Sequence, residues 1–464
     1  MKLTFGLPEL DKMLKEMLYL NSLIVIAGHP GAGKTSLASK ICYENAKLGN
    51  RCLYITFQED KRKLFKIMKN LGIDLEYIEK EGLLKFLKLP ITFVAIEKIL
   101  DDINNQIARF RPKIIIIDSM NTFLKAAKEE EKRAYLQNYF YTLSSIIDGM
   151  VVLIAELPFG QERINLGDIE FVADAVLIMK HKIEHGLLVR TLELRKARGS
   201  PIIEAEIPFS IVQGYGIRLH VSPIIEELPK HEETIAPPCN LLEKTIGNTP
   251  IDYTIYISYP PDMRPGEVAP IIIALAVANK KRALVISYRY SSMAFKDLVI
   301  NILEQFGYDG ESYYNYISKY IDFIGINPFA FSLSELYQRE IDLVTSRNYD
   351  IVIFHGIELV ERALEPRYLH KLVNQLLYLK SKGKLVIRLG SEIHEETYRM
   401  NAAISDIVLK FEIPEYAQYK DCRLMIWARG NPRYYASCGE IIECVRESIE
   451  KIEKITISEG ESHG

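Results

Sequence analysis

The sequence predicts an α/β protein with two tandem domains, each built on a central, mostly parallel β-sheet flanked by helices. The chain has 464 residues, about three times the length of a typical domain. In its first half, continuous apolar runs alternate with segments whose apolar residues recur at helical spacing, which is typical of a parallel sheet covered on both faces. The second half repeats this pattern.

Each element of the first half has its own signature. The expected strands are the apolar runs Ser22–Ala27, Arg51–Phe57, Lys113–Asp118, Met150–Glu156 and Ala175–Lys180. The expected helices are Lys34–Leu48 and Phe93–Phe110, where apolar residues return at three- and four-residue steps. From Leu187 to Leu219 the sequence alternates and contains turn residues, which predicts an antiparallel extension of the sheet.

The second half matches the first in the same order. Its strands are expected at Tyr253–Ser258, Arg282–Tyr288 and Asp350–His355. Asp406 follows Asp174 by 232 residues, and Arg429 follows Arg198 by 231, which predicts a tandem duplication. We therefore expect one domain at residues 1–222, a Pro-rich linker at 223–250, a second domain at 251–446 and a polar tail at 447–464.

Composition and charge exclude several classes of protein. Lys and Arg (58) nearly balance Asp and Glu (61), so the net charge of −3 argues against binding of nucleic acid by charge alone. No apolar run approaches the ~20 residues of a membrane helix, and no apolar signal segment opens the chain, so we expect a cytoplasmic protein. The abundance of Lys, Glu, Ile and Tyr leans toward thermophile usage. The cysteines lack metal-ligand spacing, and we expect reduced thiols rather than disulfides at Cys42, Cys52, Cys239, Cys422, Cys438 and Cys444.

A phosphate-binding loop follows the first expected strand. Residues 28–35 fit the pattern G-x-x-x-x-G-K-[ST] between a strand and a helix, where backbone amides and the helix N-terminus bind phosphate. Lys34 is expected to reach the β and γ phosphates, and the Thr35 hydroxyl to ligate Mg²⁺. The cofactors expected are therefore ATP and Mg²⁺. The expected ATP-binding residues are Gly28, His29, Pro30, Gly31, Ala32, Gly33, Lys34, Thr35 and Ser36.

Two acidic positions complete the expected site. Asp118 ends a buried strand at the edge where open α/β sheets bind ligands, and we expect it to hold Mg²⁺, through water, beside Thr35. Glu59 follows the neighbouring strand and is expected to polarise the attacking water as a general base. The alternative is that Glu59 and Asp60 form an N-cap cluster for the next helix.

Three segments together resemble the KaiC family within the RecA/RadA superfamily of ATPases. They are the leader Thr4–Asp11, the strand end Thr56-Phe57-Gln58-Glu59 and the hairpin Arg190–Ser200. The resemblance covers Met1 to about Leu219 well and Ile251 to about Arg446 in outline. It implies two RecA-like P-loop domains.

The resemblance also implies a subunit interface. In that family the Lys and Arg of the hairpin reach the γ-phosphate bound by the neighbouring subunit, and the matching residues are Lys196 and Arg198. We therefore expect a homo-oligomer, for which a hexameric ring would fit, with both residues catalytic in trans. The alternative is a solvated basic hairpin.

The sequence departs from the family pattern at three places. Gln58 replaces the first of two adjacent glutamates, which predicts slow hydrolysis because glutamine is no base. The adjacent serine and threonine that accept phosphate in the clock member of this family would fall at Glu170-Phe171 and Ala402-Ala403, so autophosphorylation there is not expected. The second domain has Tyr259–Glu267 in place of the phosphate loop, Tyr288-Arg289-Tyr290 in place of the glutamates and His355 in place of the strand-end aspartate, so we expect no hydrolysis there.

These features favour a slow ATPase in which nucleotide controls ring assembly or signalling and the second domain is a scaffold or a surface for a protein partner. A RadA-like DNA recombination mediator is the first alternative, but the expected DNA-facing loops, Ser119–Lys132 and Leu157–Gly167, carry few unbalanced cations. The second alternative is an interaction protein that binds ATP without hydrolysing it.

Overall fold

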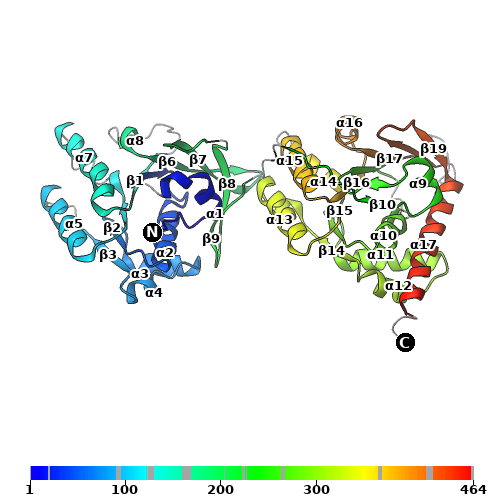
Figure 1. Ribbon diagram of the computed structural model, residues 1–464, viewed down its shortest axis with the longest axis horizontal. Coiled ribbons are helices and arrows are strands. Elements are labelled where there is room, and N and C mark those ends of the chain that lie inside the picture. Colours follow the sequence, from blue (N-terminus) through cyan, green and yellow to red (C-terminus); the bar gives the residue numbers. More distant parts are fainter. Residues whose placement is uncertain are drawn as a thin grey trace. The chain divides into compact units, whose positions relative to one another are not determined.

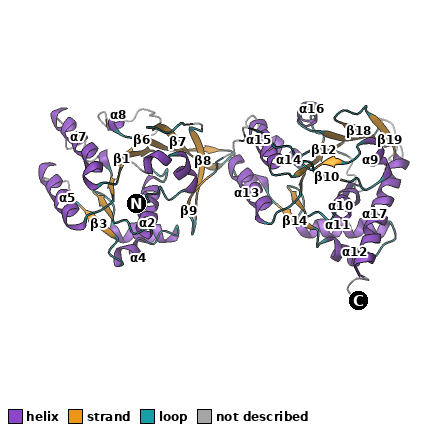
Figure 2. Cartoon of the chain, viewed as in Figure 1, coloured by secondary structure: helices purple, strands orange, loops and turns teal. Residues whose placement is uncertain are grey.

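The structure is a computed structural model that describes residues 2–18, 21–89, 96–121, 123, 130–158, 169–202, 204–221, 225, 227–262, 266, 268–363, 368–413 and 422–460. The chain divides into two compact units, Met1–Val221 and Ser222–Gly464 (Figure 1). Each has a sheet covered by helices (Figure 2). In the described residues, no helix combines the length and the apolar character that a membrane crossing requires.

The first unit is built on one sheet, which has nine strands in the described residues, in the order β3-β2-β4-β5-β1-β6-β7-β8-β9. From β3 to β6 neighbouring strands are parallel, and β7 to β9 extend the sheet in antiparallel fashion. The strands are β1 (Ser22–Gly28), β2 (Cys52–Thr56), β3 (Leu84–Lys88), β4 (Ile114–Asp118), β5 (Met150–Glu156), β6 (Ala175–Glu184), β7 (Leu187–Ala197), β8 (Glu206–Val212) and β9 (Gly216–Leu219).

Helices cover both faces of this sheet, as the apolar strands predict. Successive residues of β1 point to opposite faces, so Ile24 packs in the cluster of α2, whereas Val25 packs in the cluster of α5 and α7. The helices are α1 (Pro8–Met13), α2 (Lys34–Lys47), α3 (Lys61–Asn70), α4 (Leu75–Lys80), α5 (Ile96–Phe110), α7 (Glu130–Ile147) and α8 (Ile169–Val172), with a 3-10 turn at Lys15–Leu18.

The second unit repeats the strand order. Its main sheet runs β14-β13-β15-β16-β12-β17-β18-β19 through the described residues, which is the order of the first sheet without the last strand. Its strands are β12 (Thr254–Tyr259), β13 (Ala283–Ser287), β14 (Ile321–Gly325), β15 (Ile351–His355), β16 (Leu385–Ser391), β17 (Ile407–Glu412), β18 (Arg423–Ala428) and β19 (Tyr434–Ser437). Its helices are α10 (Val268–Ala278), α11 (Ser292–Gln305), α12 (Gly310–Ile317), α13 (Leu333–Ser346), α14 (Ile357–Ala363), α15 (Tyr368–Ser381), α16 (Glu395–Ala403) and α17 (Cys438–Gly460), with a 3-10 turn at Pro328–Ala330.

The repeat extends to individual hydrogen bonds. Asp174 accepts a hydrogen bond from the Leu23 amide at 2.9 Å, and its carbonyl accepts one from the Arg198 amide at 2.9 Å. Asp406 makes the same two bonds, with the amides of Thr254 and Arg429, at the same distances. The predicted fold class, two tandem α/β domains with mostly parallel sheets, is confirmed.

The stretch expected to be a linker, residues 223–250, is largely folded onto the second unit. It forms β10 (Thr234–Ile235), α9 (Asn240–Thr245) and β11 (Thr249–Pro250). Ile235 and Leu242 are buried in that unit's core. The prolines and charges of this stretch indicated a linker, but its few apolar residues have a core to enter.

The expected polar tail, residues 447–464, is also different in the structure, because α17 continues to Gly460. Val445, Ile449 and Ile452 are buried at helical spacing against the second unit's core. The apolar stripe of this helix thus outweighs its many charged residues.

The expectation of reduced cysteines is wrong for four of the six. Disulfides join Cys42 to Cys52 and Cys239 to Cys444, with Cα atoms 5.7 Å and 5.1 Å apart. The remaining two sulfurs, of Cys422 and Cys438, lie 2.7 Å apart. The partners in the second disulfide are 205 residues apart, so spacing along the chain carried no signal of the pairing.

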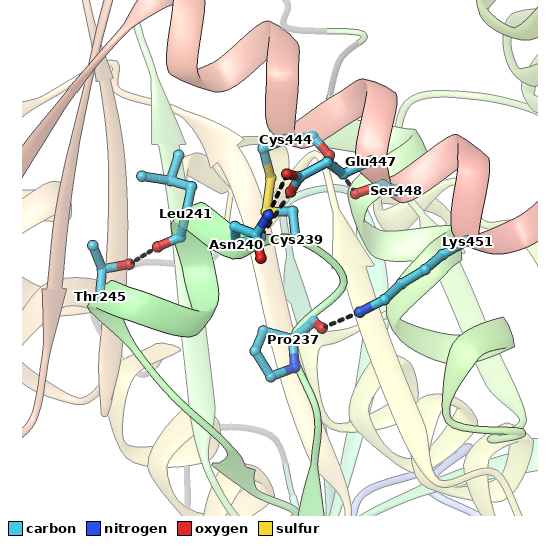
Figure 3. Close-up of a disulfide and its surroundings, with 9 residues drawn as sticks. All are labelled: Pro237, Cys239, Asn240, Leu241, Thr245, Cys444, Glu447, Ser448 and Lys451. Carbon is cyan, nitrogen blue, oxygen red and sulfur yellow. Dashed lines mark hydrogen bonds between the residues drawn. A yellow bond between two sulfur atoms is a disulfide. The ribbon is translucent and has the colours of Figure 1, made fainter.

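Removing the second disulfide is expected to lower the stability of the second unit. Figure 3 shows Cys239, just before α9, bonded to Cys444 of α17, with Asn240 hydrogen-bonded to Glu447 beside it. Loss of a native disulfide costs about 2–5 kcal/mol. The double variant Cys239→Ser/Cys444→Ser should therefore melt at a lower temperature than the wild type, as measured by calorimetry without reductant. Cys438→Ser is the control, and equal melting of the double variant and the control would contradict the expectation.

Candidate functional site

The phosphate loop lies where β1 meets α2. All of β1 is buried, and its last residue, Gly28, pairs with Glu156 of β5 and with Met179 of β6. A Cβ at Gly28 would lie 2.2 Å from the Met179 carbonyl oxygen, so only glycine fits there. Gly33 precedes α2 with φ of 102°, a conformation that favours glycine. Packing and backbone geometry thus explain two of the motif's glycines.

Lys34 folds back into this loop. Its ammonium donates hydrogen bonds to the carbonyl oxygens of Gly28 and His29, both at 2.9 Å, and the residue is 8% exposed. Burial lowers the pKa of Lys34, and the carboxylates of Glu156 and Asp118 oppose that effect. The positive charge is therefore held inside the loop rather than in solvent.

Asp118, at the end of β4, accepts hydrogen bonds from two hydroxyl groups. Thr35 donates to its Oδ2 at 3.0 Å, and the Tyr54 hydroxyl donates to the same oxygen at 2.9 Å. Burial raises the pKa of Asp118, which these two hydrogen bonds partly counter. A buried carboxylate beside a threonine hydroxyl is a hard oxygen donor set, which fits Mg²⁺.

Glu59 lies in the loop after β2, the strand next to β4. Its amide donates to the Thr56 hydroxyl at 3.1 Å, and Thr56 pairs with Asp118 in the sheet. Glu59 is half-buried, and its charge contributes to the raised pKa of Asp118. Gln58 is exposed, whereas Asp60 accepts a hydrogen bond from the Lys63 amide and caps α3. The structure therefore assigns the capping role to Asp60 and places Glu59 at the site edge.

Sequence reasoning missed three residues around the loop. Glu156 ends β5 opposite Gly28 and interacts electrostatically with Lys34. His181 packs its ring against His29, with centroids 5.8 Å apart, and Tyr54 bonds to Asp118. Glu156 could have been found by the rule that found Asp118, because both carboxylates end buried parallel strands. Tyr54 and His181 had no comparable signal, since contacts across a sheet are not visible in a single strand.

Lys196 and Arg198 lie near the amino ends of the parallel strands, away from the phosphate loop. Both cations donate to the Phe171 carbonyl oxygen, at 2.8 Å and 3.2 Å, and Arg198 also pairs with Asp174 at 3.3 Å. Asp174 binds the amide of Leu23, at the amino end of β1, whereas the phosphate loop follows the carboxyl end. The rise of a strand puts about 17 Å between those ends. The structure thus brings Lys34, Thr35, Asp118 and Glu59 together at the carboxyl ends of the parallel strands. Both hairpin cations of the same subunit lie at the amino ends of these strands.

The cations of the hairpin do not all interact with the same group. Lys196 and Arg198 share the Phe171 carbonyl, while the Arg195 guanidinium turns to Glu193 at 2.7 Å. Burial, followed by the neighbouring Arg198 charge, lowers the pKa of Lys196. The two expected DNA-facing loops, Ser119–Lys132 and Leu157–Gly167, lie largely outside the described residues.

The second unit has a different set of residues at the equivalent edge. Ser287 pairs with His355 as Thr56 pairs with Asp118, and the Tyr290 amide donates to the Ser287 hydroxyl at 2.9 Å, as Glu59 does to Thr56. His355 and Tyr290 therefore occupy the places of Asp118 and Glu59. The segment Tyr259–Glu267 lies partly outside the described residues.

Comparison with known proteins gives a family for the first unit. The family model described as "ATPase: KaiC" matches residues 3–223. Similar curated proteins are named circadian clock oscillator protein KaiC, from a Picosynechococcus species (28% identical over 200 residues), from Parathermosynechococcus lividus (26%) and from Prochlorococcus marinus (26%). Each match covers 43% of this chain and 39%, 37% and 40% of the respective relative, so the chain spans about two fifths of the length of these proteins. Residues 3–223 therefore form an ATPase domain of the KaiC family.

Proposed function

We propose that the first unit binds ATP with Mg²⁺ and hydrolyses it slowly, and that bound nucleotide controls the assembly or signalling state of a homo-oligomer. The observation that carries this proposal is the convergence of Lys34, Thr35 and Asp118 at the mouth of the loop. A buried ammonium, a hydroxyl and a carboxylate are the groups that hold a metal-bound triphosphate.

Each group has a separate role in the proposed reaction. Lys34 exchanges the loop carbonyls for phosphate oxygens and stabilises charge on the transferred phosphoryl group. Thr35 and Asp118 would hold Mg²⁺, which would supply positive charge to offset that of the phosphates. Glu59 orients water and accepts its proton. Gln58 adds no second base, which supports a slow rate.

The remaining cations act from a neighbouring subunit in this proposal. Lys196 and Arg198 lie at the sheet edge away from their own phosphate loop, so a head-to-tail ring would bring them to the next loop. A hexamer is the ring size we propose for this chain. The second unit, with His355 and Tyr290 at the equivalent edge, serves as a scaffold or partner surface rather than a second ATPase.

We further propose that the protein works in the cytoplasm. Disulfides are rare in the cytosol of mesophiles, but intracellular proteins of hyperthermophiles carry them. The abundance of Lys, Glu, Ile and Tyr agrees with that origin.

A non-hydrolysing ATP-dependent interaction protein is the second candidate. Gln58, which is exposed, favours it because glutamine cannot act as a base. Single-turnover hydrolysis of ATP in excess Mg²⁺ separates the two. Release of phosphate in proportion to the amount of enzyme supports an ATPase. ATP that stays bound and intact supports the second candidate. The same reaction in EDTA tests the metal, because loss of Mg²⁺ should remove the activity.

Glu59→Gln should leave ATP affinity nearly unchanged and lower hydrolysis, because it removes a base and no phosphate ligand. A general base contributes about 10²–10⁴ in rate. Asp60→Asn is the matched control, since Asp60 caps α3 and asparagine caps as well. Turnover by Glu59→Gln at the rate of Asp60→Asn would exclude Glu59 as the base.

A further inference from the structure

The second unit contains an apolar cavity next to the edge that binds phosphate in the first unit. Its volume is about 100 Å³, and it lies between the sheet and helices α10 and α11. Its walls include Val268, Ala269, Ile272, Phe295 and Leu298. In open α/β sheets this edge is where ligands bind.

His355 supplies a polar group at this cavity, and its hydrogen bonds determine which nitrogen carries the proton. The Ser287 hydroxyl oxygen accepts from the amides of Arg289 and Tyr290, at 3.2 Å and 2.9 Å. Those two bonds occupy its lone pairs, so its proton goes to Nδ1 of His355, 2.9 Å away. The histidine proton is therefore on Nε2, and His355 is one of the residues that line the cavity.

The cavity disfavours both a charged His355 and a charged ligand. Burial, with the nearby Arg289 cation, lowers the pKa of His355 to about 4, so the ring is neutral at physiological pH. The Arg289 guanidinium is itself engaged by the carboxylate of Glu358. No Lys, Arg, Asp or Glu is among the described residues that line the cavity. Among the described lining residues, an anionic ligand such as a nucleotide therefore finds no compensating cation.

We propose that this cavity is a binding site for a small neutral molecule with an apolar body and one hydrogen-bond acceptor, which receives the Nε2–H of His355. A cavity of 150 Å³ with apolar walls holds benzene, so a volume of about 100 Å³ buries the larger part of one phenyl ring, or a short branched alkyl group. Tyr290 stacks on the imidazole, with ring centroids 5.2 Å apart, and holds the donor in place. The duplicated fold has kept its ligand-binding edge and replaced the charged chemistry with apolar recognition.

Acetophenone, toluene and benzoate test this site on the full-length protein, by saturation-transfer NMR and calorimetric titration. Acetophenone has a ring and a carbonyl acceptor, toluene lacks the acceptor and benzoate is charged. We expect acetophenone to bind about tenfold more tightly than toluene, because one hydrogen bond to a buried donor separates them. Benzoate should not bind measurably.

Two variants separate the donor from the cavity. His355→Phe keeps a ring but removes the donor, so acetophenone should bind this variant only as weakly as toluene does. The affinity for toluene should be the same in the variant and the wild type. Ala269→Phe fills the cavity and should abolish binding of both. Equal affinities of acetophenone and toluene for the wild type, or an unchanged acetophenone affinity in His355→Phe, would overturn the proposal. ATP affinity should be unaltered in both variants, since the nucleotide site is in the other unit.

Discussion

Replacing Arg198 with alanine is expected to reduce ATP turnover by about 10³–10⁵-fold while ATP affinity stays nearly normal. The position of Arg198 supports a role at a neighbouring subunit. Its guanidinium lies beside Asp174 at the amino end of β1 and does not touch its own phosphate loop. A cation that reaches the neighbour's γ-phosphate stabilises charge that develops in the transition state. Turnover and nucleotide affinity are measured on the same preparation, by phosphate release and by titration.

Mixing variants tests whether Arg198 acts between subunits. Arg198→Ala subunits keep an intact Glu59, and Glu59→Gln subunits keep an intact Arg198, so a mixed ring contains interfaces where both are present. We expect the mixture to recover part of the activity that each variant lacks alone. A residue that acts on its own subunit's ATP gives no such recovery.

The duplicated unit provides the control for this experiment. Arg429 occupies the place of Arg198 and pairs with Asp406 at 2.7 Å. Arg429→Ala should leave turnover nearly unchanged, because no phosphate loop motif exists in its own unit's copy of the fold. Loss of hydrolysis in Arg429→Ala together with normal hydrolysis in Arg198→Ala would refute the assignment of one active and one inactive unit.

Lys34→Ala is expected to abolish ATP binding. The Lys34 ammonium is held by the Gly28 and His29 carbonyls inside the loop, where it would be available to the phosphates of bound ATP. Alanine leaves the loop's amides but removes the cation that offsets the phosphate charge. Titration with a fluorescent ATP analogue measures the loss, and particle mass with and without ATP shows whether assembly depends on that binding.

Lys47→Ala is the matched control for Lys34→Ala. Lys47 is in the last turn of the same helix, where it is half exposed and pairs with Glu44 at 2.8 Å. Its loss should affect neither ATP affinity nor assembly. Retention of full ATP affinity by Lys34→Ala would remove the central claim of a nucleotide site at the loop.

Much of the fold could be predicted because its strands are buried on both faces. The isoleucine run of β4 and the apolar run of β1 show this burial directly, and Asp118 and Gly28 mark where each strand ends. The loop motif is local, so its position between strand and helix was also visible. Tertiary contacts were not, because Tyr54 reaches Asp118 across the sheet.

The errors concern segments whose partners are distant in sequence. The expected linker and tail contain Ile235 and Ile452, which only the second unit's core could identify as buried residues. The Cys239–Cys444 disulfide was missed for the same reason, since a Cα separation of 5.1 Å between these residues depends on the whole intervening fold.

That last disulfide also determines how the second unit would carry mechanical load. The bond joins residues just before α9 and within α17, so every strand from β12 to β19 lies inside the covalent ring. A force between residues 222 and 460 therefore passes through one sulfur–sulfur bond and bypasses the sheet. With a separation of 205 residues, about 700 Å of extended chain is withheld from stretching until the bond is reduced. The core strands would stay folded under tension that extends the segments outside the ring.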